Sequence, residues 1–330
     1  MIAGFLPLSG ASAAVVAAVL SALSVGLLLR WAHRLPGDEP NARSLHRQPV
    51  PRVGGIAVWA GYVPAMWAGG YAPPADVLGW VALGTVAAVS LADDRRGVPA
   101  AVRLAVHVGA AALVAVPLVG TSGALAVVLA TLAIAWSANL YNFMDGSDGL
   151  AGAMAVCGFG TLAAGAAIAG APAGPLVVVA AATLPFLCVN WPPARMFMGD
   201  VGSVPLGFLA AASSVAGCAT DLWPAWFPLL AFLPFVVDAT ATLGRRLLRR
   251  ERVWQAHRSH YYQRFHQLGA GHRGTLAAAL ALFAGTGGSA VVTRVVDGPG
   301  WVVAAVWLAL IATLFAAIDY HWGIQRTRIR

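Results

Sequence analysis

The sequence predicts an all-α integral membrane protein with about eleven transmembrane helices, in a single domain over residues 1–330. Hydrophobic residues make up 59% of the chain and charged residues only 10%, with a mean hydropathy of +0.74. This composition is far from that of a soluble domain. Apolar runs of roughly 17 to 22 residues, long enough to cross about 30 Å of hydrocarbon as helices, also recur along the whole length.

The apolar runs are separated alternately by short outer connections and by longer, polar inner ones. The first run has no basic residue before it and Arg30 directly after it, which favours a retained helix over a cleaved signal peptide. Several later runs are short or rich in glycine. The predicted spans are residues 9–30, 53–70, 76–92, 100–118, 122–138, 149–169, 173–190, 203–219, 224–243, 274–293 and 300–320.

The basic residues predict the orientation of these spans. All 21 are arginines, and with the N-terminus outside, every one except Arg294 falls on the same face. The positive-inside rule makes this face cytoplasmic. The C-terminus is therefore expected in the cytoplasm.

The net charge of +8 is mostly a charge of this cytoplasmic surface. It suits anionic lipid headgroups and anionic soluble substrates. Nucleic acid is a disfavoured partner, because no soluble domain carries the charge. Cys157, Cys188 and Cys218 fall within or at the ends of apolar runs without metal-ligand spacing, as expected of small buried residues.

Five inner segments hold nearly all the side chains that can do chemistry. This one-sided clustering indicates a single site at the cytoplasmic surface, whereas a transport path would tend to place charges near mid-membrane on several helices. The third span ends in Asp93-Asp94. Two adjacent carboxylates repel, so a divalent metal or a proton would relieve them. The alternative is a solvated helix end paired with Arg95 and Arg96.

The segment "NLYNFMDGSDGLAG" follows the fifth span. Asp145 and Asp148 are three residues apart, with Asn139 and Asn142 before them at the same spacing, so each pair shares a face if helical. Glycines between them allow close approach of the backbone to a ligand. An ordinary loop would explain the glycines but not a second carboxylate pair on the same face.

In "NWPPARMFMGDVGS" a single carboxylate, Asp200, lies between glycines, five residues after Arg195. The segment also has the signature of a helix start, with Ser203 as a candidate cap for the eighth span. The two interpretations are compatible, since a helix N-terminus facing the site also favours phosphate.

The last inner loop carries arginines and histidines among aromatic residues. Zinc binding, a solvated basic face and phosphate binding are the competing interpretations. Irregular histidine spacing and the lack of a nearby cysteine disfavour zinc, whereas arginine and histidine together suit a diphosphate. The residues concerned are His257, Arg258, His260, Arg264, His266 and His272.

The residues alone thus indicate a metal-dependent enzyme that acts on a phosphate-bearing soluble substrate and, because of its location, a lipid co-substrate. Mg²⁺ fits oxygen ligands and phosphates, with Mn²⁺ as the alternative.

Taken together, these segments resemble the polyprenyl-phosphate N-acetylhexosamine-1-phosphate transferases, a family that includes phospho-MurNAc-pentapeptide transferase. The resemblance runs from about Asp38 to Arg273 and is carried in order by "DD", "NxxNxxDGxDGLAG", "NxPPAxxFMGDxGSxxLGF" and the Arg/His loop. The first loop, "PNARSLHRQPVPRVGG", also looks like the first cytoplasmic loop of the family.

The resemblance implies ten or eleven helices in a bacterial inner membrane, with a periplasmic N-terminus. It also implies transfer of a sugar 1-phosphate from a UDP-N-acetylhexosamine to undecaprenyl phosphate, which releases UMP. We expect direct attack of the lipid phosphate on the β-phosphorus, with a covalent phospho-enzyme as the alternative. Asp93 is the candidate to hold or deprotonate the lipid phosphate.

Residue by residue, the resemblance assigns catalysis to the aspartate pairs, metal binding to Asp200 and Asp93, and uracil stacking to Phe197. The expected catalytic residues are Asp93, Asp94, Asp145 and Asp148, and the expected substrate-binding residues are Arg43, His46, Arg52, Asn139, Asn142, Asn190, Arg195, Phe197, Asp238, His257, Arg258, His260 and Arg264.

The sequence departs from the family where Tyr262 and Gln263 replace a histidine pair and Arg195 replaces a common lysine. The form "AHRSHYYQR" looks more like the O-antigen branch, which initiates lipopolysaccharide glycans. Aromatic surface from Tyr261 and Tyr262 would favour a 6-deoxy sugar of the QuiNAc or FucNAc type over GlcNAc. The alternative is that both tyrosines merely anchor the loop at the membrane interface.

Rival functions are a CDP-alcohol phosphotransferase, a prenyltransferase and, less favoured, a transporter. The first would have Ala-Arg soon after Asp-Gly, where this chain has Gly149-Leu150. The sequence leaves the oligomeric state open, with a homodimer as one option.

Overall fold

The protein is a bundle of long helices, seen in a computed structural model that describes residues 7–32, 37–38, 50–252 and 257–329. All eleven predicted spans are helices. They are α1 (Gly10–Arg30), α2 (Gly54–Ala68), α3 (Asp76–Arg96), α4 (Ala100–Val119), α5 (Ala124–Phe143), α6 (Leu150–Ile168), α7 (Gly174–Asn190), α8 (Asp200–Ala219), α9 (Trp226–Leu248), α11 (Gly271–Val295) and α12 (Gly300–Ile329).

Within the described residues, nine helices are long and apolar enough to cross a membrane, and α7 is a shorter apolar helix. Large apolar side chains on α1, α4, α5 and α12 are exposed, as expected where helices face lipid. The chain is therefore a multi-pass membrane protein.

The remaining elements are short and lie in the connections. They are the two-residue strands β1 (Gly37–Asp38) and β2 (Val50–Pro51), which pair antiparallel, a 3₁₀ turn (Gly120–Ser122), the helix α10 (Tyr261–Phe265) and a π turn (His266–Ala270). Helix α10 was not among the predicted elements.

Three helices extend further into the polar segments than predicted. Asp93 and Asp94 belong to α3, Asn139 and Asn142 belong to α5, and α8 begins at Asp200. Hydropathy marks only the part of a helix inside hydrocarbon, whereas backbone hydrogen bonding continues beyond it. These polar side chains are consequently held on rigid helices.

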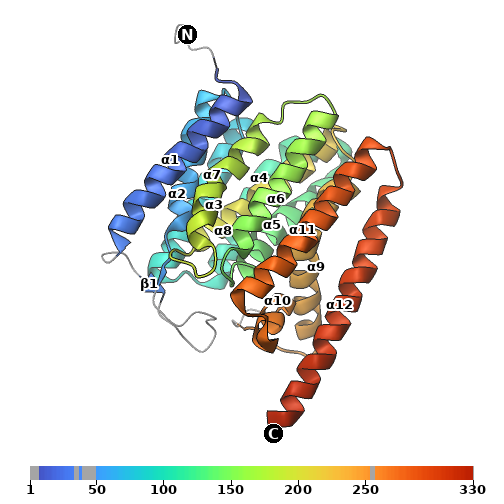
Figure 1. Cartoon of the computed structure of the whole chain (residues 1–330). Helices are drawn as coiled ribbons and strands as arrows, with labels where there is room; N and C mark the ends of the chain where they lie inside the picture. The colour runs from blue at the N-terminus through green and yellow to red at the C-terminus, as the bar shows by residue number, and fades with distance from the viewer. Residues whose placement is uncertain (1–6, 33–36, 39–49, 253–256, 330) are drawn as a thin grey trace.

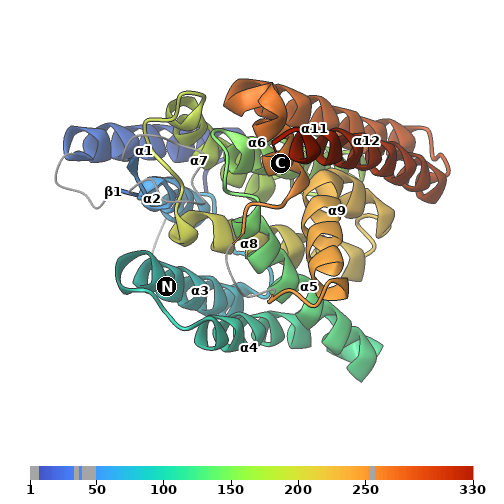
Figure 2. The same cartoon turned by 90° about the horizontal axis from the view of Figure 1, so that it is seen from below.

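The helix axes run roughly parallel, and the last residues of α1, α3, α5, α7 and α9 all lie at one end (Figure 1). We call this the arginine-rich end. Seen from that end, α8 lies near the centre of the bundle (Figure 2). It packs against α2, α3, α4, α5 and α6, so its first residues meet the ends of several neighbours.

Two segments distant in sequence join at the start of α8. Phe197 N–H donates to Pro51 O at 2.8 Å, and Gly55 N–H donates to Met198 O at 2.8 Å. A Cβ on Gly55 would lie 2.4 Å from the Gly202 backbone, so only glycine permits this approach. The indole N–H of Trp59 donates to Val201 O at 2.7 Å and fixes α2 against α8.

The arrangement predicts the membrane topology. Reporters fused after Gly97 and after Arg273 lie at the arginine-rich end and should report the cytoplasm, whereas a reporter near Pro299 should report the opposite side. An external signal at Gly97 would contradict a single cytoplasmic site.

The packing of α2 on α8 predicts the effect of Gly55→Ala. The added methyl group would overlap the Gly202 backbone, and overpacking of this kind costs about 1–3 kcal/mol. We expect a lower Tm of the purified protein. Gly109→Ala is the matched control, because nothing lies within 4 Å of a Cβ there and alanine favours a helix; equal Tm values for the two variants would refute the close approach.

Candidate active site

The first turn of α8 is capped by a carboxylate from another helix. Asp94 accepts hydrogen bonds from the backbone N–H groups of Asp200 at 3.1 Å and Val201 at 2.9 Å. Helix starts leave such donors without partners inside the helix, and a carboxylate also suits the positive end of the helix dipole. Ser203, the predicted cap, instead donates to Gly199 O and to Asn142 Oδ1. That prediction was wrong because a partner from α3 is invisible to local sequence.

Two arginines hold three carboxylates together at this point. Arg52 Nη2 donates to Asp200 Oδ1 at 3.0 Å and lies 3.5 Å from Asp94 Oδ1. Arg103 Nη1 contacts Asp93 and lies 3.5 Å from Asp200 Oδ2. We call these five residues the acidic cluster. Three carboxylates face two guanidinium groups, which leaves an excess of negative charge.

Helix α5 supplies the amides next to the acidic cluster. Asn142 Nδ2 donates to Asp200 Oδ2 at 3.2 Å. Asn139 lies one turn deeper and donates to Ala135 O, so only Asn142 reaches the carboxylates by a hydrogen bond. Of the two predicted asparagines, Asn142 therefore contacts the acidic cluster, whereas Asn139 bonds within its own helix.

Asp145 follows α5 and is half-buried. Burial raises the pKa of Asp145 well above its usual range, the nearby charges of Asp200 and Asp94 raise this pKa further, and Arg52 opposes the shift. A carboxyl group in such surroundings binds a proton or a cation readily. The charges of Asp145 and of the acidic cluster therefore influence one another.

Asp148 and Asn190 brace the loops around the site. Asp148 Oδ2 accepts from Ala194 N–H at 3.0 Å, and its own N–H donates to His272 Nδ1 at 3.2 Å. Asn190 accepts from Gly149 N–H and donates to Met196 O, both at 2.8 Å. Both side chains are buried. Their hydrogen bonds to the protein indicate that they shape the site.

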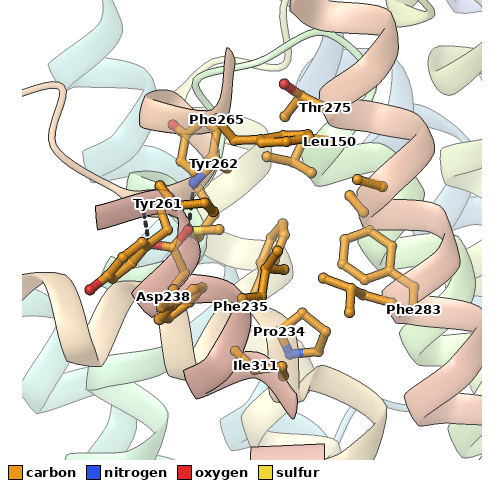
Figure 3. Close-up of a pocket in the computed structure, with 17 residues that line it drawn as sticks. Leu150, Pro234, Phe235, Asp238, Tyr261, Tyr262, Phe265, Thr275, Phe283 and Ile311 are labelled. Atoms are coloured by element: carbon orange, nitrogen blue, oxygen red, sulfur yellow. Dashed lines mark hydrogen bonds between the residues drawn. The ribbon is translucent and has the colours of Figure 1, made fainter. Parts of the chain in front are cut away.

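The last loop forms a second buried unit. Asp238 of α9 accepts from the N–H groups of Tyr261 and Tyr262, each at 2.9 Å, and thereby caps α10 (Figure 3). His260 Nδ1 lies 3.3 Å from Asp238 Oδ1, and the His260 ring stacks on His257. Asp238 and His260 are buried, so their first role is to fix the loop.

Arg264 lies away from the acidic cluster and pairs with Asp319 of α12 at 2.5 Å. Tyr261 donates to Asp319 and Tyr262 to Phe143 O, and both tyrosines are buried. They do not form an open aromatic surface. These contacts anchor the loop within the protein, and the preference for a 6-deoxy sugar stays a prediction.

The other predicted residues have less defined surroundings. Arg195 and Arg258 are exposed, and Phe197 is half-buried beside β2. Arg43 and His46 lie outside the described residues. Arg103 was not among the predicted site residues. Its only signal in the sequence is its position as a lone arginine ten residues after Asp93, at the start of a predicted span.

The donors of the acidic cluster fit a Mg²⁺ ion. In the described part of the chain, no group of three or more His, Cys, Asp or Glu side chains has the geometry to hold a metal ion by itself. Mg²⁺ bound with substrate phosphates needs only one or two carboxylates. Asp93 and Asp200 already share one cationic nitrogen of Arg103, so this position accommodates positive charge between hard oxygen donors.

The segments that form the acidic cluster also match known proteins. The profile of glycosyl transferase family 4 matches residues 77–218, which include all three aspartates of the acidic cluster. The chain is 30% identical over 310 residues to decaprenyl-phosphate N-acetylglucosaminephosphotransferase of Mycobacterium tuberculosis, covering 78% of this chain and 76% of that protein.

Two further relatives agree. A probable undecaprenyl-phosphate N-acetylglucosaminyl 1-phosphate transferase of Bacillus subtilis is 29% identical over 283 residues, which cover 78% of this chain and 79% of that protein. Phospho-N-acetylmuramoyl-pentapeptide-transferase of Synechococcus elongatus is 32% identical over 220 residues, which cover 56% and 58%. With its helical membrane fold and its acidic cluster, the chain belongs to glycosyl transferase family 4, the family of the polyprenyl-phosphate N-acetylhexosamine-1-phosphate transferases.

Proposed function

We propose that the protein transfers an N-acetylhexosamine 1-phosphate from a UDP-sugar to undecaprenyl phosphate at the cytoplasmic face of a bacterial inner membrane. The observation that carries this proposal is the acidic cluster at the start of α8, where arginines and a helix N-terminus meet carboxylates. The names of the relatives favour GlcNAc as the sugar.

The reaction would join two phosphates. An oxygen of the lipid phosphate attacks the β-phosphorus of the UDP-sugar, the bond from that phosphorus to the bridging oxygen breaks, and UMP leaves with the bridging oxygen. The products are a lipid diphosphate sugar and UMP. A glycan built on this lipid, such as an O-antigen or a cell-wall polymer, would start here.

Arg52 and Arg103 are the groups suited to bind the phosphates. One guanidinium group can donate two parallel hydrogen bonds to two phosphate oxygens. Each arginine is already held at the site by a carboxylate. Asp200 and Asp93 would hold Mg²⁺, which when bound neutralises charge on the diphosphate. The arginines would then exchange part of their carboxylate contacts for substrate oxygens.

Asp145 is our candidate to accept a proton from the lipid phosphate. Its pKa is raised by burial and by neighbouring carboxylates, whereas Asp93 is paired with Arg103 and with Val98 N–H. We therefore assign the proton to Asp145 and assign Asp93 to holding the cation. This revises the expectation that Asp93 deprotonates the substrate.

UMP release tests the proposed function. Purified protein with undecaprenyl phosphate and UDP-GlcNAc should release UMP with Mg²⁺ and not with excess EDTA. Asp200→Asn should lower turnover by about 100-fold or more, because the variant would lose a ligand of the Mg²⁺ ion that balances the negative charge of the transferring phosphate. UMP release that needs no lipid phosphate would refute the reaction.

Asp221→Asn is the matched control for this variant. Asp221 is exposed in the turn after α8, at the opposite end of the bundle, and asparagine tolerates its positive φ. It should keep parental turnover. The Asp94 cap binds backbone N–H groups, so Asp200→Asn should keep a near-parental Tm, and substantial Mg²⁺-dependent activity in that variant would contradict the assignment.

The pH dependence tests Asp145. A carboxyl group with a raised pKa keeps its proton to higher pH, so the fraction able to accept a proton increases as the pH rises. We expect kcat to rise with pH through this raised pKa and Asp145→Asn to remove that rise and lower kcat by about 100-fold. A variant profile that still follows the parental rise would exclude Asp145 as the base.

A further inference from the structure

An apolar pocket of about 90 Å³ lies between α9, α10, α11 and α12, and no residue of the acidic cluster lines it. Phe235 and Phe283 lie on opposite sides of its centre, with Pro234 and Ile311 at one end and Leu150 and Tyr262 at the other (Figure 3). Its lining is almost wholly hydrocarbon. Apolar cavities of this kind exclude water and accept apolar ligands.

The pocket borders the lipid-facing surface. Leu314 of α12 is 36% exposed and lines the pocket. Ala278 and Leu282 of α11 also line it and are only partly buried. A hydrocarbon chain can therefore reach the pocket from the bilayer between α11 and α12.

A cluster of cations adjoins the pocket at the arginine-rich end. Arg245 and Arg264 share the carboxylate of Asp319, at 2.9 Å and 2.5 Å. Both guanidinium groups lie over the Tyr261 ring, 4.6 Å and 5.4 Å from its centroid. Tyr261 in turn stacks on Phe315, and both rings line the pocket. Cation site and pocket therefore share a wall.

The cation cluster is not neutralised within the described residues. Arg249 adds a third positive charge near Arg264, whereas Asp319 is the one carboxylate that pairs with the arginines there. Arg264 is 7% exposed, and its Nε and the Arg245 Nη2 have no hydrogen-bond partner among the residues described. Buried donors without partners are costly, and an anionic oxygen would satisfy them. The Asp319 side chain is 41% exposed, so the cluster reaches the surface.

We propose that this region binds one anionic phospholipid, with part of one acyl chain in the pocket and its phosphate on Arg245 and Arg264. The positive charge of these arginines matches the negative headgroups of the membrane leaflet that is expected at the arginine-rich end. Arginine is the side chain best suited to phosphate oxygens. The lipid would join α12 to α9 and α10 and is separate from the proposed reaction.

The carrier lipid has related chemistry but a different place in the protein. Its phosphate must reach the acidic cluster on α3 and α8, whereas the cations beside the pocket belong to α9 and α10 and pair with α12. We therefore assign the pocket to a membrane phospholipid.

Lipid retention tests the proposal. The purified full-length protein, exchanged into detergent, is titrated with phosphatidylglycerol or phosphatidylcholine and followed by native mass spectrometry and by Tm. We expect one retained phosphatidylglycerol and a higher Tm, with phosphatidylcholine at least about tenfold weaker, a ratio worth ~1.4 kcal/mol. Equal retention of the two lipids would overturn the proposal.

Two variants with matched controls localise the lipid. Arg245→Gln leaves the Arg264–Asp319 pair in place and should weaken phosphatidylglycerol about tenfold, whereas Arg96→Gln makes the same charge change on an exposed residue of α3 and should not. Ala279→Phe fills the pocket and should abolish retention, unlike Ala281→Phe on the lipid-facing surface of α11.

The outcomes separate this proposal from the proposed function. If Arg245→Gln binds phosphatidylglycerol like Arg96→Gln, the headgroup assignment is wrong. If undecaprenyl phosphate displaces the retained phosphatidylglycerol, the pocket belongs to the carrier lipid and the phospholipid proposal fails. UMP release is measured separately and does not bear on either result.

Discussion

The site depends on one constraint, which is that the first backbone N–H groups of α8 have no hydrogen-bond partner within the helix itself. A helix that begins inside a membrane protein, away from bulk water, must find acceptors for its first N–H groups. Asp94 supplies them from α3. That contact brings α3 and α8 together at the arginine-rich end, and Asp93 and Asp200 approach each other as a consequence. Arg52 and Arg103 then reduce the repulsion among the carboxylates.

The same device recurs elsewhere at this end of the protein. Asp238 binds the first N–H groups of α10, and Asp148 binds Ala194 N–H in the loop before α8. Carboxylates that the sequence presents as one chemical group therefore divide into two kinds. Some are committed to backbone donors and shape the loops, whereas Asp200 and Asp145 lie among charged side chains.

Rigid placement of these groups suits phosphoryl transfer, in which catalysis depends on positioning and on electrostatic stabilisation. Each polar side chain of the acidic cluster comes from a helix or from a segment bonded to one. Glycine at position 55 lets α2 approach α8, which brings Arg52 to Asp200. The last helix, α12, does not supply a side chain to the acidic cluster. It supports α10, because Asp319 binds Arg264 and Tyr261.

The amino-acid sequence predicted the membrane fold, the eleven long helices and the face that carries the polar segments, because hydrophobic length and arginine bias are local properties. It also identified Asp93, Asp94, Asn142 and Asp200, which the fold brings together. The packing of the helices makes Asp94 the cap of α8 and brings Arg103 into the cluster. It also commits Asp148, Asp238 and the two tyrosines to hydrogen bonds within the protein. A hydrogen bond between distant helices is set by packing geometry, and spacing along a chain does not encode which of several equivalent carboxylates meets which backbone donor.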